Sequence, residues 1–216
     1  MQDLIQVTGM ILKQTPIGEY DRRICLLTKE RGKISAFVRG SRKPGSRLSS
    51  ATNPFSFGVF KLHVGKNAYN VQEADIQNYF EDLRMDYIGA YYGMYFAEIA
   101  DYYTRENSDE KEMLKLLYQS LRALSVPSLS RELVRYIFEL KSIVINGEFP
   151  GLPADWELEP STEYAVQFIV NAPIEKLFTF TVSESVLAQL EQLSRHYCGK
   201  IWDREFKSLE IIKTLC

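Results

Sequence analysis

The sequence predicts an α+β protein, in which a small all-β domain precedes an all-helical domain. Three observations lead to this prediction. Between residues 5 and 74, apolar and polar residues alternate in short runs that turn residues separate, as they do in strands. After residue 75, apolar residues recur every three or four positions, as they do in helices. The sign of the net charge also changes near this position. Residues 1–80 carry 12 basic and 6 acidic residues, whereas the rest of the chain carries 14 basic and 22 acidic residues. We therefore expect two domains, 1–78 and 79–216.

The first domain is expected to contain five strands. Gly18–Asp21 forms a turn after the first strand, and Lys29–Gly32 has the length of a hairpin connection. A loop rich in glycine, serine, arginine and lysine, residues 40–52, separates the third strand from the fourth. Five short strands over about 70 residues suit a small closed barrel of the OB type. The expected strands are 5–17, 24–28, 33–39, 55–64 and 69–74.

The second domain is expected to be helical. Tyr87–Tyr103 is apolar nearly all round, which is typical of a buried central helix. Ser108-Asp109 can cap the next helix. Ser130 can begin the helix after that, and Gly147 can end it. The remaining expectations are an irregular segment over 146–160, helices over 183–197 and 207–214, and either strand or helix over 168–170 and 177–182.

Positive charge is concentrated between positions 22 and 47, where nine basic residues accompany one acid, Glu30. Such an excess indicates a surface for polyanions, although a solvated basic surface would give the same composition. Arginine forks match phosphate oxygens, and the glycines and serines of residues 40–47 allow close approach. Phe37 and Phe60 have strand spacing and are expected in the core, whereas Tyr20 in the first turn is a better candidate for base stacking. The expected phosphate-binding residues are Arg22, Arg23, Arg31, Lys33, Arg39, Arg42, Lys43 and Arg47.

No pattern of residues indicates catalysis. Gly40 and Gly45 have the spacing of a nucleotide-binding phosphate loop, but Ser46-Arg47 stands where that loop needs a lysine and a hydroxyl residue. His196 and Cys198 are expected to pack against their neighbours rather than hold a metal. We expect no enzymatic activity, no catalytic residue and no cofactor.

The sequence also predicts where the protein works. No stretch approaches the ~20 apolar residues that a membrane-spanning helix needs. No signal peptide is visible at the N-terminus. Three scattered cysteines are too few for a disulfide framework and fit a reducing compartment. We therefore expect a cytoplasmic protein.

Several short motifs resemble the RecO family of recombination mediators. Gly18–Asp21 (GEYD) and Thr28–Lys33 (TKERGK) are similar to the first turn and the hairpin of that family. Arg39–Leu48 (RGSRKPGSRL) looks like its basic loop. Asn53–Phe55 resembles the segment that leads into its fourth strand, and Phe206–Leu209 resembles its C-terminus. The order and spacing of these motifs, dense over 5–76 and sparse over 80–216, identify the chain as a member of this family.

The resemblance implies an OB barrel that binds single- and double-stranded DNA and anneals complementary strands. It implies partnership with RecR and contact with the C-terminal tail of the single-stranded-DNA-binding protein (SSB), so that RecA can replace SSB on DNA. It also implies association with the nucleoid. For the tail, Arg131 and Arg135 could border an apolar groove on the helix that starts at Ser130. Two other readings stay open: an adaptor whose barrel does not bind DNA, and a metal-dependent nuclease.

The chain departs from the family in one region. Many relatives carry a four-cysteine zinc module after the Asn-Gly that closes the long helix. Here no cysteine follows Asn146-Gly147 before Cys198, and a structural zinc site usually needs four Cys or His ligands. We therefore expect a degenerate, metal-free module over about 147–182, held by the packing of Trp156, Tyr164 and Phe168.

Overall fold

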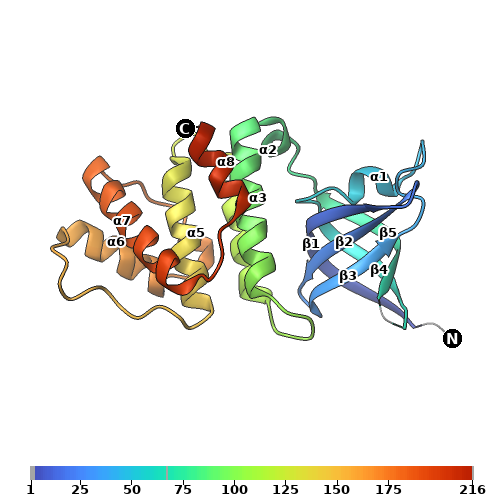
Figure 1. Cartoon of the computed structure of the whole chain (residues 1–216), viewed down its shortest axis with the longest axis horizontal. Helices are drawn as coiled ribbons and strands as arrows, with labels where there is room; N and C mark the ends of the chain where they lie inside the picture. Colours follow the sequence, from blue (N-terminus) through green and yellow to red (C-terminus); the bar gives the residue numbers. More distant parts are fainter. Residues whose placement is uncertain (1–2, 67, 216) are drawn as a thin grey trace. The chain divides into compact units, whose positions relative to one another are not determined.

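The computed structural model of the chain describes residues 3–66 and 68–215 and confirms the predicted fold class (Figure 1). Five strands close into a barrel in the order β1-β2-β3-β5-β4. Neighbouring strands are antiparallel except β3 and β5, which pair in parallel through Ala36 with Tyr69 and Phe37 with Asn70. The strands are β1 (Leu4–Ile17), β2 (Asp21–Thr28), β3 (Gly32–Val38), β4 (Phe57–Val64) and β5 (Tyr69–Asn78).

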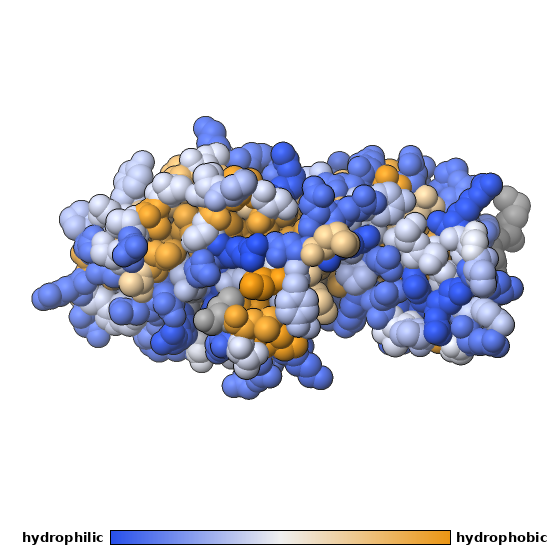
Figure 2. All heavy atoms as spheres, turned by 90° about the horizontal axis from the view of Figure 1, so that it is seen from above, coloured by the Kyte–Doolittle hydropathy of each residue, from blue (hydrophilic) through white to orange (hydrophobic). Residues whose placement is uncertain are grey.

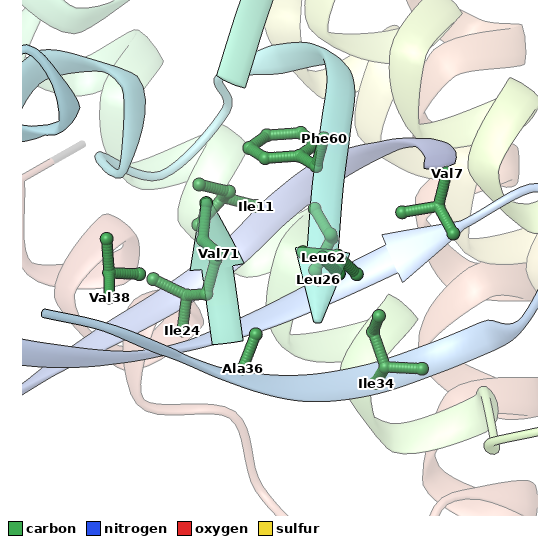
Figure 3. Packing of buried hydrophobic residues seen from close by; sticks show 10 residues of the cluster. All are labelled: Val7, Ile11, Ile24, Leu26, Ile34, Ala36, Val38, Phe60, Leu62 and Val71. Carbon is green, nitrogen blue, oxygen red and sulfur yellow. The ribbon is translucent and has the colours of Figure 1, made fainter. Parts of the chain in front are cut away.

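The barrel interior is filled by aliphatic side chains and one phenylalanine ring. Phe60 is fully buried, as predicted. Phe37 is not part of this core, which corrects the prediction. Because side chains alternate along a strand and both Ala36 and Val38 face inward, Phe37 must face outward. The inward-pointing residues are Val7, Ile11, Ile24, Leu26, Ile34, Ala36, Val38, Phe60, Leu62 and Val71 (Figure 3).

Two glycines allow the strands to approach closely. Gly9 on β1 pairs with Gly58 on β4. A Cβ atom on Gly9 would lie 2.3 Å from the backbone oxygen of Leu27, and one on Gly58 would lie 2.1 Å from that of Asp75. Since no side chain fits at such distances, both positions require glycine.

The loop between β3 and β4 is more ordered than the sequence indicated. Residues 40–52 were expected to be irregular, but they include the short helix α1 (Leu48–Ala51). The Thr52 hydroxyl donates to the backbone oxygen of Leu48 at 2.8 Å, and Ala51 is buried. This helix anchors the second half of the loop.

The rest of the chain is helical, as predicted. Ser130 caps α5 by accepting a hydrogen bond from the backbone N–H of Leu133, and Gly147 follows that helix with a φ of 72°. Residues 168–170, which fitted either structure, lie in a helix, whereas 177–182 lie in neither a helix nor a strand. The helices are α2 (Glu81–Met85), α3 (Tyr87–Tyr103), α4 (Lys111–Ala123), α5 (Arg131–Ile145), α6 (Pro160–Asn171), the 3₁₀ turn η1 (Ile174–Lys176), α7 (Glu184–Ile201) and α8 (Lys207–Leu215).

Helix α3 has a buried and an exposed face. Tyr92, Tyr95 and Phe96 are buried, and the Phe96 ring stacks on Phe138 of α5 with ring centroids 4.3 Å apart. Met94 is 44% exposed, so the expectation of burial all round does not hold for this residue. Apolar residues also gather at the surface of the helical part of the chain (Figure 2).

The region that corresponds to the expected degenerate module has its own aromatic contacts. Trp156 packs edge-on against His196 with centroids 5.0 Å apart, and Phe168 packs edge-on against Phe180 at 5.3 Å. Tyr164 is 71% exposed, so it does not help to hold this region together. That part of the packing prediction is wrong.

The chain divides into two compact units that interleave in sequence. The first comprises residues 1–82 and 97–114, and the second comprises residues 83–96 and 115–216. Helix α3 therefore contributes its first part to the second unit and its last part to the first. Within the described ranges, no helix is long and apolar enough to cross a membrane.

Candidate nucleic-acid interface

One row of side chains runs across the outer surface of the barrel. Strand pairing aligns Thr15 of β1 with Arg23 of β2, Arg23 with Phe37 of β3, and Phe37 with Asn70 of β5. Ile24 and Ala36, the chain neighbours of Arg23 and Phe37, point into the core, so this row points outward. Directly opposed residues have Cβ atoms about 5 Å apart. An arginine and an aromatic ring are therefore neighbours on this surface.

The basic loop, residues Arg39–Arg47, is held against the turn between β1 and β2. The backbone N–H of Arg42 donates to the backbone oxygen of Tyr20 at 2.9 Å, and the Arg42 guanidinium donates to that of Gly18 at 3.1 Å. The ammonium of Lys43 lies 5.5 Å from the centre of the Tyr20 ring, which is 42% exposed. Tyr20 and the loop cations thus share one surface.

The start of the basic loop has a defined backbone shape. The backbone N–H of Gly40 donates to the Asp21 carboxylate at 2.8 Å, and Gly40 and Gly45 have φ values of 64° and 75°. Only glycine adopts such angles without strain. The loop therefore presents its cations from a fixed backbone. Its exposed basic residues are Arg39, Arg42, Lys43 and Arg47.

Two of the expected phosphate ligands are engaged by other groups of the protein. The Arg22 guanidinium donates to the backbone oxygen of Ser49 at 2.7 Å and to the Thr52 hydroxyl at 2.8 Å. Burial, with a smaller effect of the nearby Arg42 charge, lowers the pKa of Arg22. Lys33 forms an ion pair with Asp101 at 3.0 Å and donates to the backbone oxygen of the same residue. Both side chains therefore make contacts that stabilise the fold of the barrel.

Asp101, from the end of α3, organises a polar cluster on the barrel surface. It forms a second ion pair with Lys13 at 2.6 Å and accepts a hydrogen bond from the Cys25 thiol at 3.5 Å. Burial alone would raise the pKa of Asp101, but hydrogen bonds and charges from Lys13 and Lys33 outweigh it and lower the pKa below its usual value. Burial, together with the Asp101 charge, raises the pKa of the Cys25 thiol to about 12.

The hairpin end of β2 and β3 is covered by the segment that follows α3. The backbone N–H of Lys33 donates to the oxygen of Arg105 at 2.9 Å, and Gly32 forms a β-bridge with Glu106. Glu106 also accepts a hydrogen bond from the Tyr69 hydroxyl at 3.1 Å. Arg31 is exposed, but it lies at this hairpin end of the strands and not beside the basic loop. The eight expected residues therefore separate into a cluster near the loop, two structural residues and Arg31.

The two arginines expected to bind a partner have different surroundings. Arg131 forms an ion pair with Asp86. Arg135 pairs at 2.7 Å with Glu139, which is only 1% exposed and also accepts hydrogen bonds from Tyr95 and Ser194. Burial opposes the charge of Arg135, but the Glu139 carboxylate outweighs it and raises the pKa of Arg135. Arg135 is thus part of a buried polar network.

A groove of about 740 Å³ opens beside this network. Arg135 and Tyr95 line it together with aromatic side chains from the end of α7 and the segment before α8, Trp202 and Phe206. Charged residues of both signs also line it, and they are Arg135, Arg195, Arg204 and Lys213 together with Glu139, Glu191, Asp203, Glu205 and Glu210. Among the residues that the structure describes, no cluster of three or more histidine, cysteine or acidic side chains could hold a metal ion.

Comparison with known proteins gives consistent matches along most of the chain. Residues 1–80 match the family model "Recombination protein O N terminal", and residues 84–155 match "Recombination protein O C terminal". The chain is 27% identical to the DNA repair protein RecO of Acetivibrio thermocellus, with 98% of this chain and 97% of the relative covered. It is 26% identical to that of Clostridium perfringens over 97% and 98% of the two chains. The protein of the same name from Moorella thermoacetica is 34% identical over 71% of this chain and 57% of its own length.

Proposed function

Because the chain belongs to the RecO family of DNA repair and recombination proteins, we propose that its barrel binds single- and double-stranded DNA through the basic loop and the neighbouring outer row. The observation that carries this proposal is the exposure of four cations, Arg39, Arg42, Lys43 and Arg47, on a loop of defined shape. Arginine and lysine neutralise backbone phosphates and release condensed counterions. DNA binding is therefore independent of sequence at this surface.

The outer row supplies a second type of contact. Phe37 and Arg23 lie side by side on β3 and β2, and Tyr20 lies in the adjoining turn. Aromatic rings stack on unpaired bases, whatever their identity, and OB barrels bind oligonucleotides on the surface of their second and third strands. We propose that Phe37 and Tyr20 stack on bases while Arg23 and the loop hold the backbone. The proposed DNA site thus omits Arg22 and Lys33.

Strand annealing follows from the same surface. Two complementary strands repel each other through their phosphates, and a shared positive surface screens that repulsion. A flat aromatic contact leaves the pairing edge of a base accessible to the other strand. We propose that the barrel anneals strands in this way.

We propose that the groove beside Arg135 receives the acidic C-terminal tail of SSB. A tail that combines acidic and apolar residues with a terminal carboxylate needs cations next to apolar surface. Trp202, Phe206 and Leu209 line the groove with apolar atoms, and Arg204 and Lys213 offer exposed cations, whereas Arg195 pairs with Glu191. Membership of the family further supports a role with RecR in loading RecA onto SSB-coated DNA.

A salt titration of DNA affinity tests the proposal. Each phosphate contact on a single strand contributes about 0.7 to the slope of log affinity against log salt, so changing Arg39, Arg42, Lys43 and Arg47 to Ala should flatten the slope by about 3 units. Affinity near physiological salt should fall at least about tenfold for any DNA sequence. Folding should survive because these side chains are exposed.

The matched control removes four exposed cations from the helical part, Arg122, Lys176, Lys200 and Lys207, and so changes the net charge equally. It should leave the slope at its original value. An equal slope in the loop variant and the unmodified protein would show that the loop is not the DNA site. A protein that gives no mobility shift with any single strand would instead be the adaptor whose barrel does not bind DNA.

A further inference from the structure

A second groove lies in the helical unit between α6, the segment 179–183 and the start of α7. Its volume is about 730 Å³. Tyr164 and Phe168 of α6 line it together with Phe180, Val182 and Val186. Tyr164 is 71% exposed although it is a large aromatic residue, and Phe168 meets Phe180 edge-on. The groove is therefore an accessible apolar surface with aromatic walls.

One wall of this groove is formed by residues 179–183, which belong to neither a helix nor a strand. From Phe178 to Val182 the sequence alternates Phe, Thr, Phe, Thr and Val, and burial alternates with it. The hydroxyl of Thr179 bonds to the oxygen of Lys176 at 2.7 Å, and Ser183 caps α7, so both ends are fixed. Within the described part of the chain, the backbone groups of Phe180, Thr181 and Val182 have no hydrogen-bond partner. Such a segment can accept an added strand.

No charged residue of the described chain lines the groove itself, but the Glu159 carboxylate lies at its edge, where it accepts a hydrogen bond from Ser185 beside Ser183. Residues 146–194 contain eight acidic residues and a single basic one, Lys176. Glu175 pairs with Lys115, and Glu191 pairs with Arg195, so two of these acids are neutralised by cations outside the range. Glu163 is exposed next to Tyr164 on α6. This charge repels nucleic acid and attracts a cationic polypeptide.

We propose that this groove is a docking site for an extended, basic segment of a partner protein. The segment adds as a strand along residues 180–182, so that its backbone bonds to their unbonded amides and carbonyls. An aromatic or branched aliphatic side chain of the segment inserts between Tyr164 and Phe168. Lysine or arginine residues at its alternate positions face Glu159 and Glu163. The site is separate from the proposed DNA surface and does not depend on it.

The probe is a short fluorescent peptide in which lysine alternates with phenylalanine and valine. We expect saturable binding to the full chain, measured by fluorescence anisotropy. A peptide with glutamate in place of every lysine should not bind. Tyr164→Ala should weaken binding of the basic peptide about tenfold, because an aromatic contact is lost. The matched control is Tyr87→Ala, which removes a ring that is 63% exposed elsewhere in the same unit and should leave binding unchanged.

Two methylated peptides test the strand geometry. Alternate amides of a strand point to opposite sides, so methylation of one alternate set of amides blocks hydrogen bonding to residues 180–182, and methylation of the other set does not. We expect one methylated peptide to bind at least about tenfold more weakly than the other. Equal affinities would overturn strand addition. Absence of saturable binding, or unchanged binding by Tyr164→Ala, would overturn the site. The DNA affinity and the circular dichroism spectrum of both tyrosine variants should match those of the unmodified protein. A loss of peptide binding through misfolding can therefore be told apart from a loss of the contact itself.

Discussion

The role of a residue in a barrel strand depends on whether its side chain points into the core or out to the surface, and this alternates from one residue to the next. Phe37 faces outward because its neighbours on β3, Ala36 and Val38, point into the core. Arg23 faces outward because its neighbour on β2, Ile24, points into the core. Arg22, one position earlier, turns toward α1 and becomes a structural residue. Two consecutive arginines therefore have different roles: Arg23 is exposed on the outer surface, and Arg22 stabilises the fold.

The outward position of Phe37 leads to a prediction about single-stranded DNA. Phe37→Ala should weaken single-strand binding by about 1–3 kcal/mol, because one base loses its stacking partner. The salt slope should not change, since no phosphate contact is removed. Duplex DNA is the control, because its bases are already stacked and the loss should be much smaller. An equal loss of affinity for duplex and single-stranded DNA would indicate that Phe37 stabilises the fold of the site and does not stack on a base.

Asp101 gives a prediction about stability and pH. Its pKa is lowered in the folded protein, so it contributes stability above the unfolded pKa of about 4, and this contribution is lost as the pH falls through the folded pKa. Asp101→Asn should reduce the free energy of unfolding by about 1–2 kcal/mol at pH 7, a figure kept small because Lys13 is largely exposed. Urea unfolding at several pH values should show this difference shrinking below about pH 4. A difference that stays constant with pH would mean that Asp101 acts through packing alone.

At the scale of secondary-structure elements, alternation and helical spacing predict most of the fold, and long-range contacts account for what they miss. The strands and long helices follow from local periodicity and caps such as Ser130. Helix α1 has four residues, too few for a helical period to be visible. The structural roles of Arg22 and Lys33 depend on partners distant in sequence, Thr52 and Asp101. Residue type favours the core for Phe37, but the strand alternation with the buried Ala36 and Val38 puts it on the opposite face.

The hairpin between β2 and β3 offers a test of the contact with the segment after α3. Gly32 has a φ of 63°, and a Cβ atom there would lie 2.2 Å from the backbone oxygen of Arg105. Gly32→Ala should therefore combine backbone strain of about 1 kcal/mol with a clash that separates the two segments. Gly18→Ala is the control, because Gly18 has a φ of 54° but nothing within 4 Å of the added atom. Urea midpoints should fall clearly further for Gly32→Ala. Equal midpoints would show that the segment after α3 can move away from the added methyl group without a loss of stability.

At the scale of the whole molecule, charge is arranged locally rather than by domain. Residues 1–82 and 97–114, which form the first unit, hold 14 basic and 14 acidic residues. Acids such as Asp101 and Glu106 lie near the hairpin end of the barrel, where Lys29 and Arg31 are also exposed, and four more exposed cations lie on the basic loop. The positive surface is thus a small area on a neutral unit. This arrangement favours local phosphate contacts over long-range attraction of any polyanion.

Separate sites for DNA and for the SSB tail predict independent losses. The quadruple loop variant should bind a labelled copy of the tail with unchanged affinity. Arg135→Gln combined with Glu139→Gln should weaken tail binding about tenfold and leave DNA affinity unchanged, because the pair is removed without leaving a buried charge. Arg122→Gln, which removes an exposed cation that does not line the groove, is the control and should bind the tail normally. Tail binding that falls in the loop variant would contradict separate sites.

The interleaving of the two units has a consequence for the chain as it is made. The barrel strands end at Asn78, but the first unit is completed only by residues 97–114. Ribosomes add about 5–20 residues per second, so the stretch from residue 82 to residue 114 takes about two to six seconds to synthesise. During that interval Asp101 has not yet reached its place over Lys13, Lys33 and Cys25. The nascent barrel therefore passes through a short period in which the Cys25 thiol faces the solvent, and an oxidant or alkylating agent can reach it then more readily than in the finished protein.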